Sequence, residues 1–209
     1  MGSKLGGRRD LDSYGGEADE LTPRILDAAL ERFAEDGVRR ATMNTIADRA
    51  GVGVATVYRR FPQKELLVNA VIMREAAYAF AAVNGAIDAA ETAEDQLVAG
   101  FVAFTTELSQ RKLWRELVDS DHGYGGLFVS KNGSPILDLG RSFLAGIIAR
   151  WQADNEVAAF DAELVAEIFA RLAHSLALTP DGLIPVSDPE RARWFARTHL
   201  IPLLSPSLP

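Results

Sequence analysis

One short stretch decides the fold of this chain. Residues 41–67 read ATMNTIADRAGVGVATVYRRFPQKELL. Thr42 is placed to cap a short helix, and the apolar residues that follow it recur on one helical face. Gly51-Val52-Gly53 interrupts this helix. A second helix is expected over 54–61, ended by Pro62 because proline disfavours helical backbone at the residue before it. Two helices of about eight residues joined by a glycine-containing turn are typical of a helix-turn-helix.

The helix expected over 54–61 separates two kinds of residue. An arc of about 100°, the width of a buried stripe, holds Val54, Val57, Tyr58 and Phe61. The other side carries Ala55, Thr56, Arg59 and Arg60. Small residues allow close approach to DNA bases, and arginine binds guanine bidentately or neutralises phosphate. This division predicts a DNA-recognition helix, although an arginine pair taken alone is also typical of an ordinary solvated surface.

The segment before this stretch predicts a tail and then a longer helix. Residues 1–20 are rich in glycine, serine and charge, which predicts a disordered tail, with a basic arm that touches DNA as the alternative. Thr22-Pro23 is placed as an N-cap and first helical residue, and Gly37 as the C-cap. The helix-turn-helix is therefore expected to belong to a three-helix domain over 21–67.

The rest of the chain predicts one helix after another. Apolar residues at helical spacing predict helices over 64–88, 93–109, 111–119, 134–153, 157–178 and 188–204. The longest irregular segment is 120–133, and Asp188-Pro189 is a further cap followed by a first-position proline. Neither strand alternation nor an internal repeat is evident. The expected fold class is all-α, with about nine helices shared between the three-helix domain and a larger helical domain over 68–209.

Charge is unevenly distributed along the sequence. The whole chain has a formal net charge of -7. Six basic residues and one acidic residue lie between Arg39 and Lys64, whereas 11 basic and 18 acidic residues lie from Val68 to the end. A positive patch on an acidic body suits a protein that presents one face to DNA phosphates. An architectural DNA binder without sequence preference needs broader positive charge and is disfavoured.

Other features bear on location and on enzyme activity. The sequence contains no cysteine, which suits a reducing cytoplasm and excludes thiolate chemistry. It has no signal peptide and no charge-free run of about 18 apolar residues, so we expect a cytoplasmic protein without a membrane partner. Gly51 and Gly53 mimic the start of a dinucleotide-binding motif but follow a helix rather than a strand. Because His122, His174 and His199 lack metal-ligand spacing, we expect no catalytic residue, metal or cofactor.

The stretch over 41–67 closely resembles the DNA-binding motif of the TetR family of transcription regulators. The matching positions are Thr42, Ile46-Ala47, Ala50-Gly51-Val52, Tyr58, Phe61, Lys64-Glu65 and Leu67. The preceding helix matches through Ala28-Ala29, Phe33-Ala34 and Gly37. The resemblance covers Thr22 to Leu67, and beyond residue 70 the family shares architecture rather than motifs.

The resemblance implies which residues contact DNA. Phosphate contacts are implied for Thr42, Tyr58 and Lys64, the last at a helix start that also favours anions. The implied groove-facing set is Gly53, Val54, Ala55, Thr56, Arg59 and Arg60. As alternatives, Thr42 is only a cap, Tyr58 only core and Lys64 only a charge at a helix start. Gly53 stands where the family usually has a serine or threonine cap, so one hydroxyl contact to phosphate is lost. Ala55 stands where glycine is common, so the backbone approaches DNA less closely.

The resemblance also implies that the larger domain pairs with a second copy of the chain. A wide apolar face runs from Leu164 to Ala177, and the last helix adds another. The interface residues expected on these two helices are Phe169, Leu172, Leu176, Phe195, His199 and Leu203. Packing within one chain is the alternative use of the same faces.

Aromatic residues of the larger domain supply a candidate ligand pocket. The expected lining residues are Phe101, Phe104, Trp114, His122, Tyr124, Phe128, Phe143 and Trp151. Pockets between helices are mostly apolar with a few polar groups, although aromatic residues of helical domains pack in the core more often. The segment 120–133 is expected to be a gate to this pocket or simply a loop.

The function implied is that of a homodimeric repressor. Its two recognition helices would lie about 34–36 Å apart, at successive major grooves of a palindromic operator in double-stranded DNA. An unidentified small-molecule effector would favour another spacing and so lower operator affinity. An activator or a ligand-independent regulator of the same family fits the sequence as well, with one or two dimers on each operator.

Overall fold

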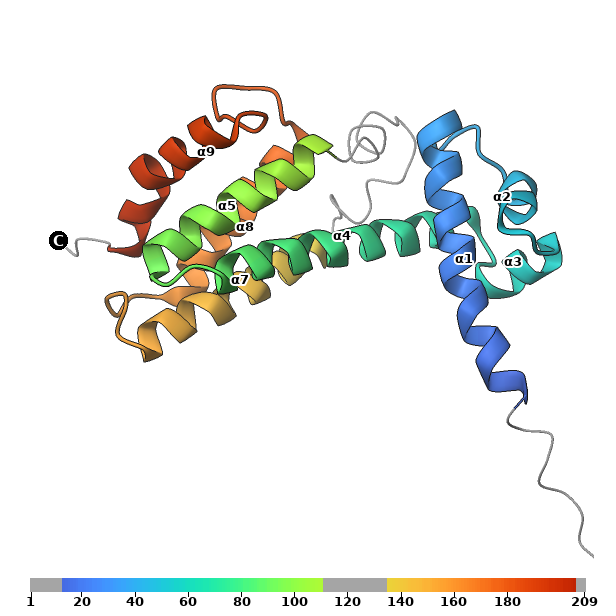
Figure 1. The fold of residues 1–209 in the computed structure, drawn as a ribbon, viewed down its shortest axis with the longest axis horizontal. Helices are drawn as coiled ribbons and strands as arrows, with labels where there is room; N and C mark the ends of the chain where they lie inside the picture. Colours follow the sequence, from blue (N-terminus) through green and yellow to red (C-terminus); the bar gives the residue numbers. More distant parts are fainter. Residues whose placement is uncertain (1–12, 111–134, 206–209) are drawn as a thin grey trace, which may run out of the picture. The chain divides into compact units, whose positions relative to one another are not determined.

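The computed structural model describes residues 13–110 and 135–205, and within these ranges every regular element is helical (Figure 1). The elements are α1 (Ser13–Asp36), α2 (Met43–Ala50), α3 (Val54–Arg60), α4 (Lys64–Asp88), α5 (Ala93–Gln110), α7 (Pro135–Ala153), α8 (Ala162–Leu178) and α9 (Pro189–Phe195). A π-helical turn, Ala196–Leu200, and a 3-10 turn, Ile201–Leu204, follow α9. The all-α fold class is confirmed. The helix expected over 111–119 and the irregular segment 120–133 lie outside the described residues.

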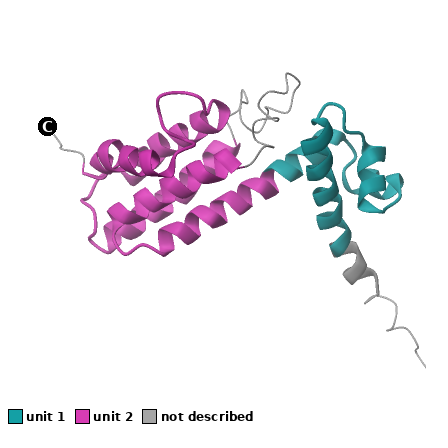
Figure 2. Ribbon diagram, turned by 45° about the horizontal axis from the view of Figure 1, so that its top comes forward, with its two compact units in different colours: residues 1–72 teal, residues 73–209 magenta. Residues whose placement is uncertain are grey.

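The chain divides into two compact units, here called unit 1 and unit 2, between Ile72 and Met73 (Figure 2). The division falls inside α4, a few residues after the boundary expected at 67/68. Leu67, Val68 and Ile72 on the first turns of α4 are completely buried. A division after Ile72 therefore assigns these turns to the helix-turn-helix unit.

Unit 1 consists of α1, α2, α3 and the start of α4. Its core is formed by Ile25, Phe33, Ile46, Val57 and Leu67, all of them fully buried. Gly37, at φ +77°, ends α1 as expected, and its N–H donates to the carbonyl of Phe33 at 3.0 Å.

The first helix begins earlier than expected, because α1 starts at Ser13 and continues through Thr22-Pro23. The Thr22 hydroxyl oxygen accepts a hydrogen bond from Nε of Arg60 at 3.2 Å. The threonine side chain therefore makes a contact between helices, where we expected an N-cap. A proline removes one N–H donor from a helix that continues through it.

Unit 2 is a bundle of α5, α7, α8, α9 and the remainder of α4. α4 and α5 approach closely at Gly100, where an added Cβ would lie 2.9 Å from Cγ1 of Ile87. The rings of Phe101 on α5 and Phe195 on α9 stack with centroids 5.6 Å apart. α7 and α8 pack against each other along their lengths, and Ala170 lies against Gly140.

Two helices of unit 2 differ clearly from those predicted. α8 begins at Ala162, where Asp161 accepts a hydrogen bond from the Leu164 N–H at 3.0 Å, and not at residue 157. The segment before it is held by Gln152, whose side-chain amide donates to the carbonyls of Ala158 and Phe160. The final helix changes from α to π and 3-10 geometry after Phe195. Pro202 follows in this segment and lacks the N–H that a regular α-helix would need.

α4 has the length and apolar composition that a membrane-crossing helix requires. A core helix of a soluble protein meets the same criterion, so this property is weak support for a membrane span. In this chain, part of α4 is buried in the cores of the two units, at Val71, Ile72, Val83 and Ile87.

Candidate nucleic-acid interface and apolar cavity

Both ends of α2 are capped by residues that the sequence specifies. Thr42 caps α2: its hydroxyl oxygen accepts from the Thr45 N–H at 3.2 Å, and the Thr45 hydroxyl oxygen accepts from the Thr42 N–H at 3.1 Å. Gly51 ends α2 in the left-handed conformation, at φ +65°, which glycine adopts without strain. The N–H of Val52 then reaches back to the carbonyl of Ala47 at 3.0 Å. The expected cap at Thr42 is confirmed.

Gly53 is the N-cap of α3, with extended backbone and no side-chain cap bond. Val57 is completely buried and Phe61 is 9% exposed, so these two residues anchor the short helix. The buried stripe predicted for this helix is wrong at its other two positions. Val54 is 36% exposed and Tyr58 is 49% exposed. Seven residues make only two turns, so the neighbouring helices cover Val57 and Phe61 while Val54 and Tyr58 lie at the margin of the contact.

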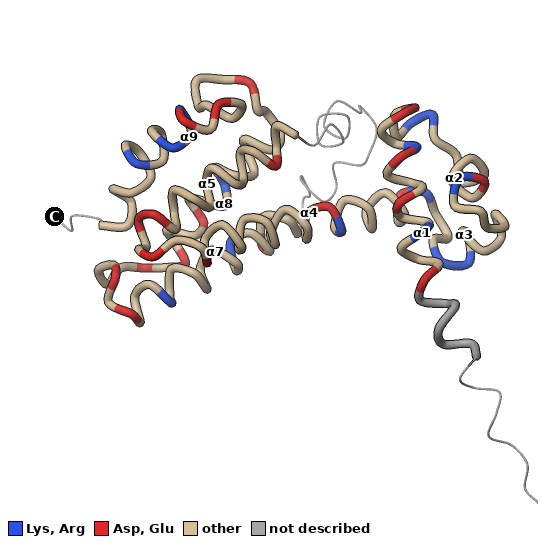
Figure 3. The backbone as a smooth tube through the Cα atoms, viewed as in Figure 1, with Lys and Arg blue, Asp and Glu red and all other residues tan. Residues whose placement is uncertain are grey.

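The structure places most of the predicted DNA-contacting residues on an exposed surface, which we call the α3 surface. Its exposed members are Thr42, Gly53, Val54, Ala55, Tyr58 and Arg59, and its half-buried members are Thr56, Arg60 and Lys64. Arg60 is not simply directed outward, because its Nε donates to Thr22. Small residues at the start of α3 and basic residues in its last turn thus lie along one short helix, and further basic residues follow in the segment after α1 (Figure 3).

Arg49 takes a different role from the other basic residues between Arg39 and Lys64. Its guanidinium donates to carboxylates of Glu31 and Glu35 on α1, each at 2.7 Å. The hydrogen bond from Arg49 lowers the pKa of Glu35, an effect that burial opposes and that the charge of Arg49 reinforces. Arg49 therefore joins α2 to α1, and the sequence-based charge of this window overstates what is available to phosphates.

Lys64 lies at the start of α4 and is half-buried. Its Nζ donates to the carbonyl of Arg39 at 3.3 Å. Burial lowers the pKa of the Lys64 ammonium, and the neighbouring charge of Glu65 acts in the opposite direction. A cation held next to a helix start with reduced hydration is suited to pairing with an anion.

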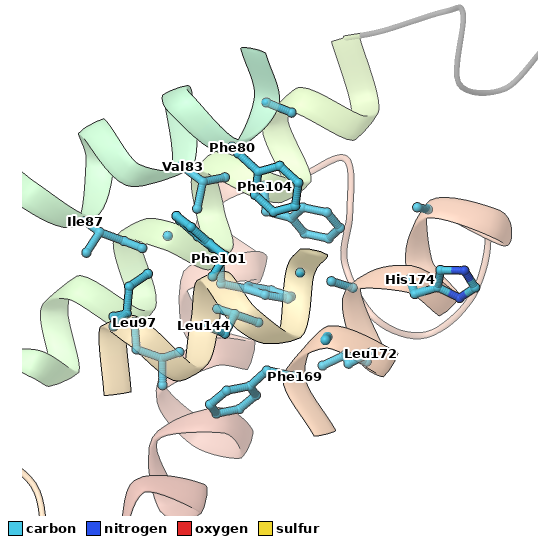
Figure 4. A pocket seen from close by; sticks show the side chains of 18 of the residues that line it. Phe80, Val83, Ile87, Leu97, Phe101, Phe104, Leu144, Phe169, Leu172 and His174 are labelled. Carbon is cyan, nitrogen blue, oxygen red and sulfur yellow. The ribbon is translucent and has the colours of Figure 1, made fainter. Parts of the chain in front are cut away.

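Unit 2 contains a cavity of about 180 Å³, here called the apolar cavity (Figure 4). Side chains of α4, α5, α7 and α8 surround it, together with Leu200 of the π-helical turn. The residues labelled in Figure 4 are Phe80, Val83, Ile87, Leu97, Phe101, Phe104, Leu144, Phe169, Leu172 and His174. The rings of Phe80 and Phe143 meet with centroids 5.2 Å apart.

Four of the eight residues predicted to form a ligand pocket line this cavity, namely Phe101, Phe104, Phe143 and Trp151. The other four, Trp114, His122, Tyr124 and Phe128, lie outside the described residues. Sequence reasoning did not identify Phe80, Phe169 or His174 as lining residues. The only available signal was their helical periodicity, which indicates an apolar face without saying whether it borders a core or a cavity.

The end of the apolar cavity next to Trp151 is fixed by hydrogen bonds. The indole N–H donates to Oε1 of Gln96 at 2.6 Å, so α7 is joined to α5. Close by in the chain, Glu156 accepts from the N–H of Ala93 at 2.6 Å and holds the start of α5. The polar atom of Trp151 is thus already used within the protein, and what this residue offers the cavity is its ring.

The residues predicted for a dimer interface divide between the core and the surface. Phe169 and Leu176 are buried within the chain, Leu172, Phe195 and Leu203 are partly buried against the same core, and His199 is exposed. The strongly exposed apolar residues of α8 and α9 are instead Leu164, Ile168 and Trp194. The ring of His199 meets that of Trp194 edge-on, with centroids 5.6 Å apart.

Comparison with known proteins gives matches to both units. Residues 25–71 match the family model described as bacterial regulatory proteins, tetR family. The chain is 32% identical over 109 residues to the HTH-type transcriptional regulator UidR of Escherichia coli (strain K12). That alignment covers 52% of this chain and 55% of UidR, so the chain spans about half the length of this curated relative.

Solved structures match over most of the chain. The TetR family repressor AlkX from Dietzia sp. strain DQ12-45-1b has a TM-score of 0.64 at 21% identity, covering 95% of this chain and 97% of AlkX. GusR of Salmonella enterica has a TM-score of 0.63 at 25% identity, covering 88% of this chain and 95% of GusR. The arrangement of helices in both units is therefore one that these proteins share.

Proposed function

This chain belongs to the TetR family of bacterial helix-turn-helix transcription regulators, a non-enzymatic family, and on that premise we propose that it is a repressor. It binds a palindromic operator in double-stranded DNA as a homodimer, and an apolar small molecule releases it. The observation that carries the proposal is the α3 surface. Buried Val57 anchors α3 from beneath, and Gly53, Ala55 and Arg59 remain exposed.

The α3 surface supports sequence-specific recognition of DNA. Small residues at the start of α3 allow the helix to approach base edges, and Arg59 is placed to bind guanine or phosphate. Thr42, Tyr58 and Lys64 are the proposed phosphate contacts. Thr42 also caps α2 and Lys64 also contacts the carbonyl of Arg39, so both are held in place before DNA arrives.

Exposed apolar residues of unit 2 support a homodimer. Leu164 and Ile168 are one helical turn apart on α8 and are 59% and 43% exposed, while Trp194 on α9 is 60% exposed. Exposed large apolar side chains that lie next to one another, as Leu164 and Ile168 do on α8, are typical of an interaction surface. A symmetric dimer would place two copies of α3 at successive major grooves, about 34–36 Å apart.

The apolar cavity supports release by a ligand. α4 supplies Lys64 at its first residue and Phe80, Val83 and Ile87 to the cavity lining, all on one continuous helix. A ligand that favours a different position of this helix lowers operator affinity by the difference in its affinity for the two states. Because its proposed partner is DNA, we place the protein in the cytoplasm.

Selection of bound sequences from a random DNA pool is the first test. The proposal predicts a palindromic consensus whose half-sites are about 10 base pairs apart, centre to centre. Arg59→Gln is expected to weaken binding to that consensus, whereas Ala149→Gln, an exposed position on α7 in unit 2, is the matched control and leaves it unchanged. Failure to enrich any sequence with folded protein at low salt would refute sequence-specific binding.

Titration of the selected operator with small apolar compounds tests release. A compound that binds the protein and dissociates the operator complex supports the repressor mechanism. A compound that binds with unchanged operator affinity points to a ligand-independent regulator, and one that raises operator affinity points to an activator.

A further inference from the structure

The chemical character of the apolar cavity restricts what it can bind. Its described lining consists of alanine, glycine, aliphatic and aromatic residues, together with Glu107 and His174 as the ionisable ones. The hydroxyls of Thr105 and Thr106, on the same stretch of α5, both donate to the carbonyl of Val102. Hydrocarbon therefore surrounds the cavity on every contributing helix.

Glu107 and His174 lie at the same end of the cavity. α5 and α7 run in opposite directions, because Trp151 near the end of α7 contacts Gln96 near the start of α5. α7 and α8 are likewise antiparallel, because Arg141 and Gly140 near the start of α7 meet Glu167 and Ala170 on α8. The last turn of α5, the first turn of α7 and the second half of α8 therefore converge. Figure 4 shows His174 at the edge of the cavity, away from Ile87 and Leu97.

From this arrangement we propose that the cavity takes an electrically neutral, hydrocarbon-rich molecule with its polar group directed to the Glu107–His174 end. The inference rests on the proposed function only in identifying this molecule with the effector. An isolated charge placed among hydrocarbon loses its hydration without compensation, which is far more costly than burying a hydroxyl that finds a partner. A carboxylate placed at the polar end would also be repelled by Glu107, and an ammonium would gain only the attraction of this one carboxylate in return for the hydration that it loses.

The size of the cavity restricts the ligand further. An apolar cavity of about 150 Å³ lined by leucine, isoleucine and phenylalanine is enough to bind benzene. The apolar cavity measures about 180 Å³. It therefore accommodates one ring with small substituents, and its aromatic lining from Phe80, Phe101 and Phe143 matches such a ring.

Four compounds built on one ring test the proposal by calorimetric titration of the full chain at pH 7. They are p-cresol and p-xylene, which are neutral, 4-methylbenzoate, an anion, and 4-methylbenzylamine, a cation at this pH. We expect both neutral compounds to bind at least tenfold more tightly than both ions. We expect p-cresol to exceed p-xylene by about threefold, as one additional hydrogen bond allows. His174→Leu is expected to abolish the advantage of p-cresol over p-xylene.

A matched pair of variants on α4 tests the location. Ala79 lines the cavity and Ala81 is exposed on the same helix. Ala79→Phe is expected to abolish binding of p-cresol, and Ala81→Phe to leave it unchanged. Circular dichroism and thermal unfolding check that both variants fold.

Several outcomes would overturn the inference. These are binding of either ion as tight as that of p-cresol, binding of none of the four compounds at millimolar concentration, and equal binding to the Ala79→Phe and Ala81→Phe variants. Operator binding is measured separately. Binding of p-cresol without operator release contradicts the proposed function and leaves the inference standing. Operator release by a charged compound supports the proposed function and contradicts the inference.

Discussion

Replacing Val57 by alanine tests whether one side chain holds the recognition helix in place. Val57 is completely buried, whereas Val54, three residues earlier on α3, is 36% exposed. A seven-residue helix is not stable by itself, so α3 depends on its contacts with the rest of unit 1. The same substitution at the two valines therefore compares a buried anchor with a residue at the margin of the contact between α3 and the neighbouring helices.

The expected magnitude follows from burial. Loss of two methyl groups from a fully buried site costs about 1.6 kcal/mol in transfer free energy. The cavity left behind adds on the order of 1 kcal/mol, and the better helix propensity of alanine offsets about 0.6 kcal/mol. Val57→Ala should therefore destabilise unit 1 by about 2 kcal/mol, which is about thirtyfold in the opening equilibrium. At Val54 the transfer loss is smaller and no enclosed cavity forms, so the net effect is about 0.4 kcal/mol, or twofold.

Native-state amide hydrogen exchange of α2 and α3 measures this difference directly, since exchange rates follow the free energy of local opening. Val57→Ala should accelerate exchange of these amides by about thirtyfold and leave the amides of α8 unchanged. It should also weaken operator binding. If the Val57→Ala and Val54→Ala variants exchange at the same rate, α3 is not held by Val57 and the reasoning fails.

Three further predictions concern unit 1. Thr42→Ala removes the cap of α2 and should cost about 1 kcal/mol, seen as a lower midpoint of thermal unfolding; an unchanged midpoint would contradict the role of the cap. Arg59→Gln should reduce the slope of log DNA affinity against log salt concentration by about 0.9 per protomer. Arg49→Gln should leave this slope unchanged, because Glu31 and Glu35 already hold the Arg49 guanidinium. Equal slopes for the two variants would contradict the assignment of Arg59 to DNA and Arg49 to α1. Because Arg49 lowers the pKa of Glu35 below its usual value of 4.5, the pair stabilises the folded state above pH 4.5 and loses this contribution as the pH falls through the lowered pKa. Urea unfolding between pH 7 and 3 should therefore show a smaller acid-induced loss in Arg49→Gln than in the unmodified chain.

Local signals in the sequence determined much of the fold. Thr42 followed by an apolar-periodic segment predicted the cap and start of α2, and the structure has both. The expected helix over 64–88 coincides with α4. Asp188-Pro189 predicted the start of α9. Caps, prolines and apolar periodicity act through neighbouring residues of the chain, so the sequence carries this information directly.

Tertiary contacts decided what each helix face does. Periodicity grouped Val54 and Tyr58 with Val57, yet only Val57 of these three is covered by its neighbours. It marked Phe169 as apolar, and packing placed that residue at a cavity within the chain. Charge counting treated Arg49 as part of a basic patch, whereas folding set it against two carboxylates of α1. Apolar periodicity gives the direction of a side chain about its own helix axis. What lies in that direction depends on residues distant in the chain, and only the folded structure brings these residues together.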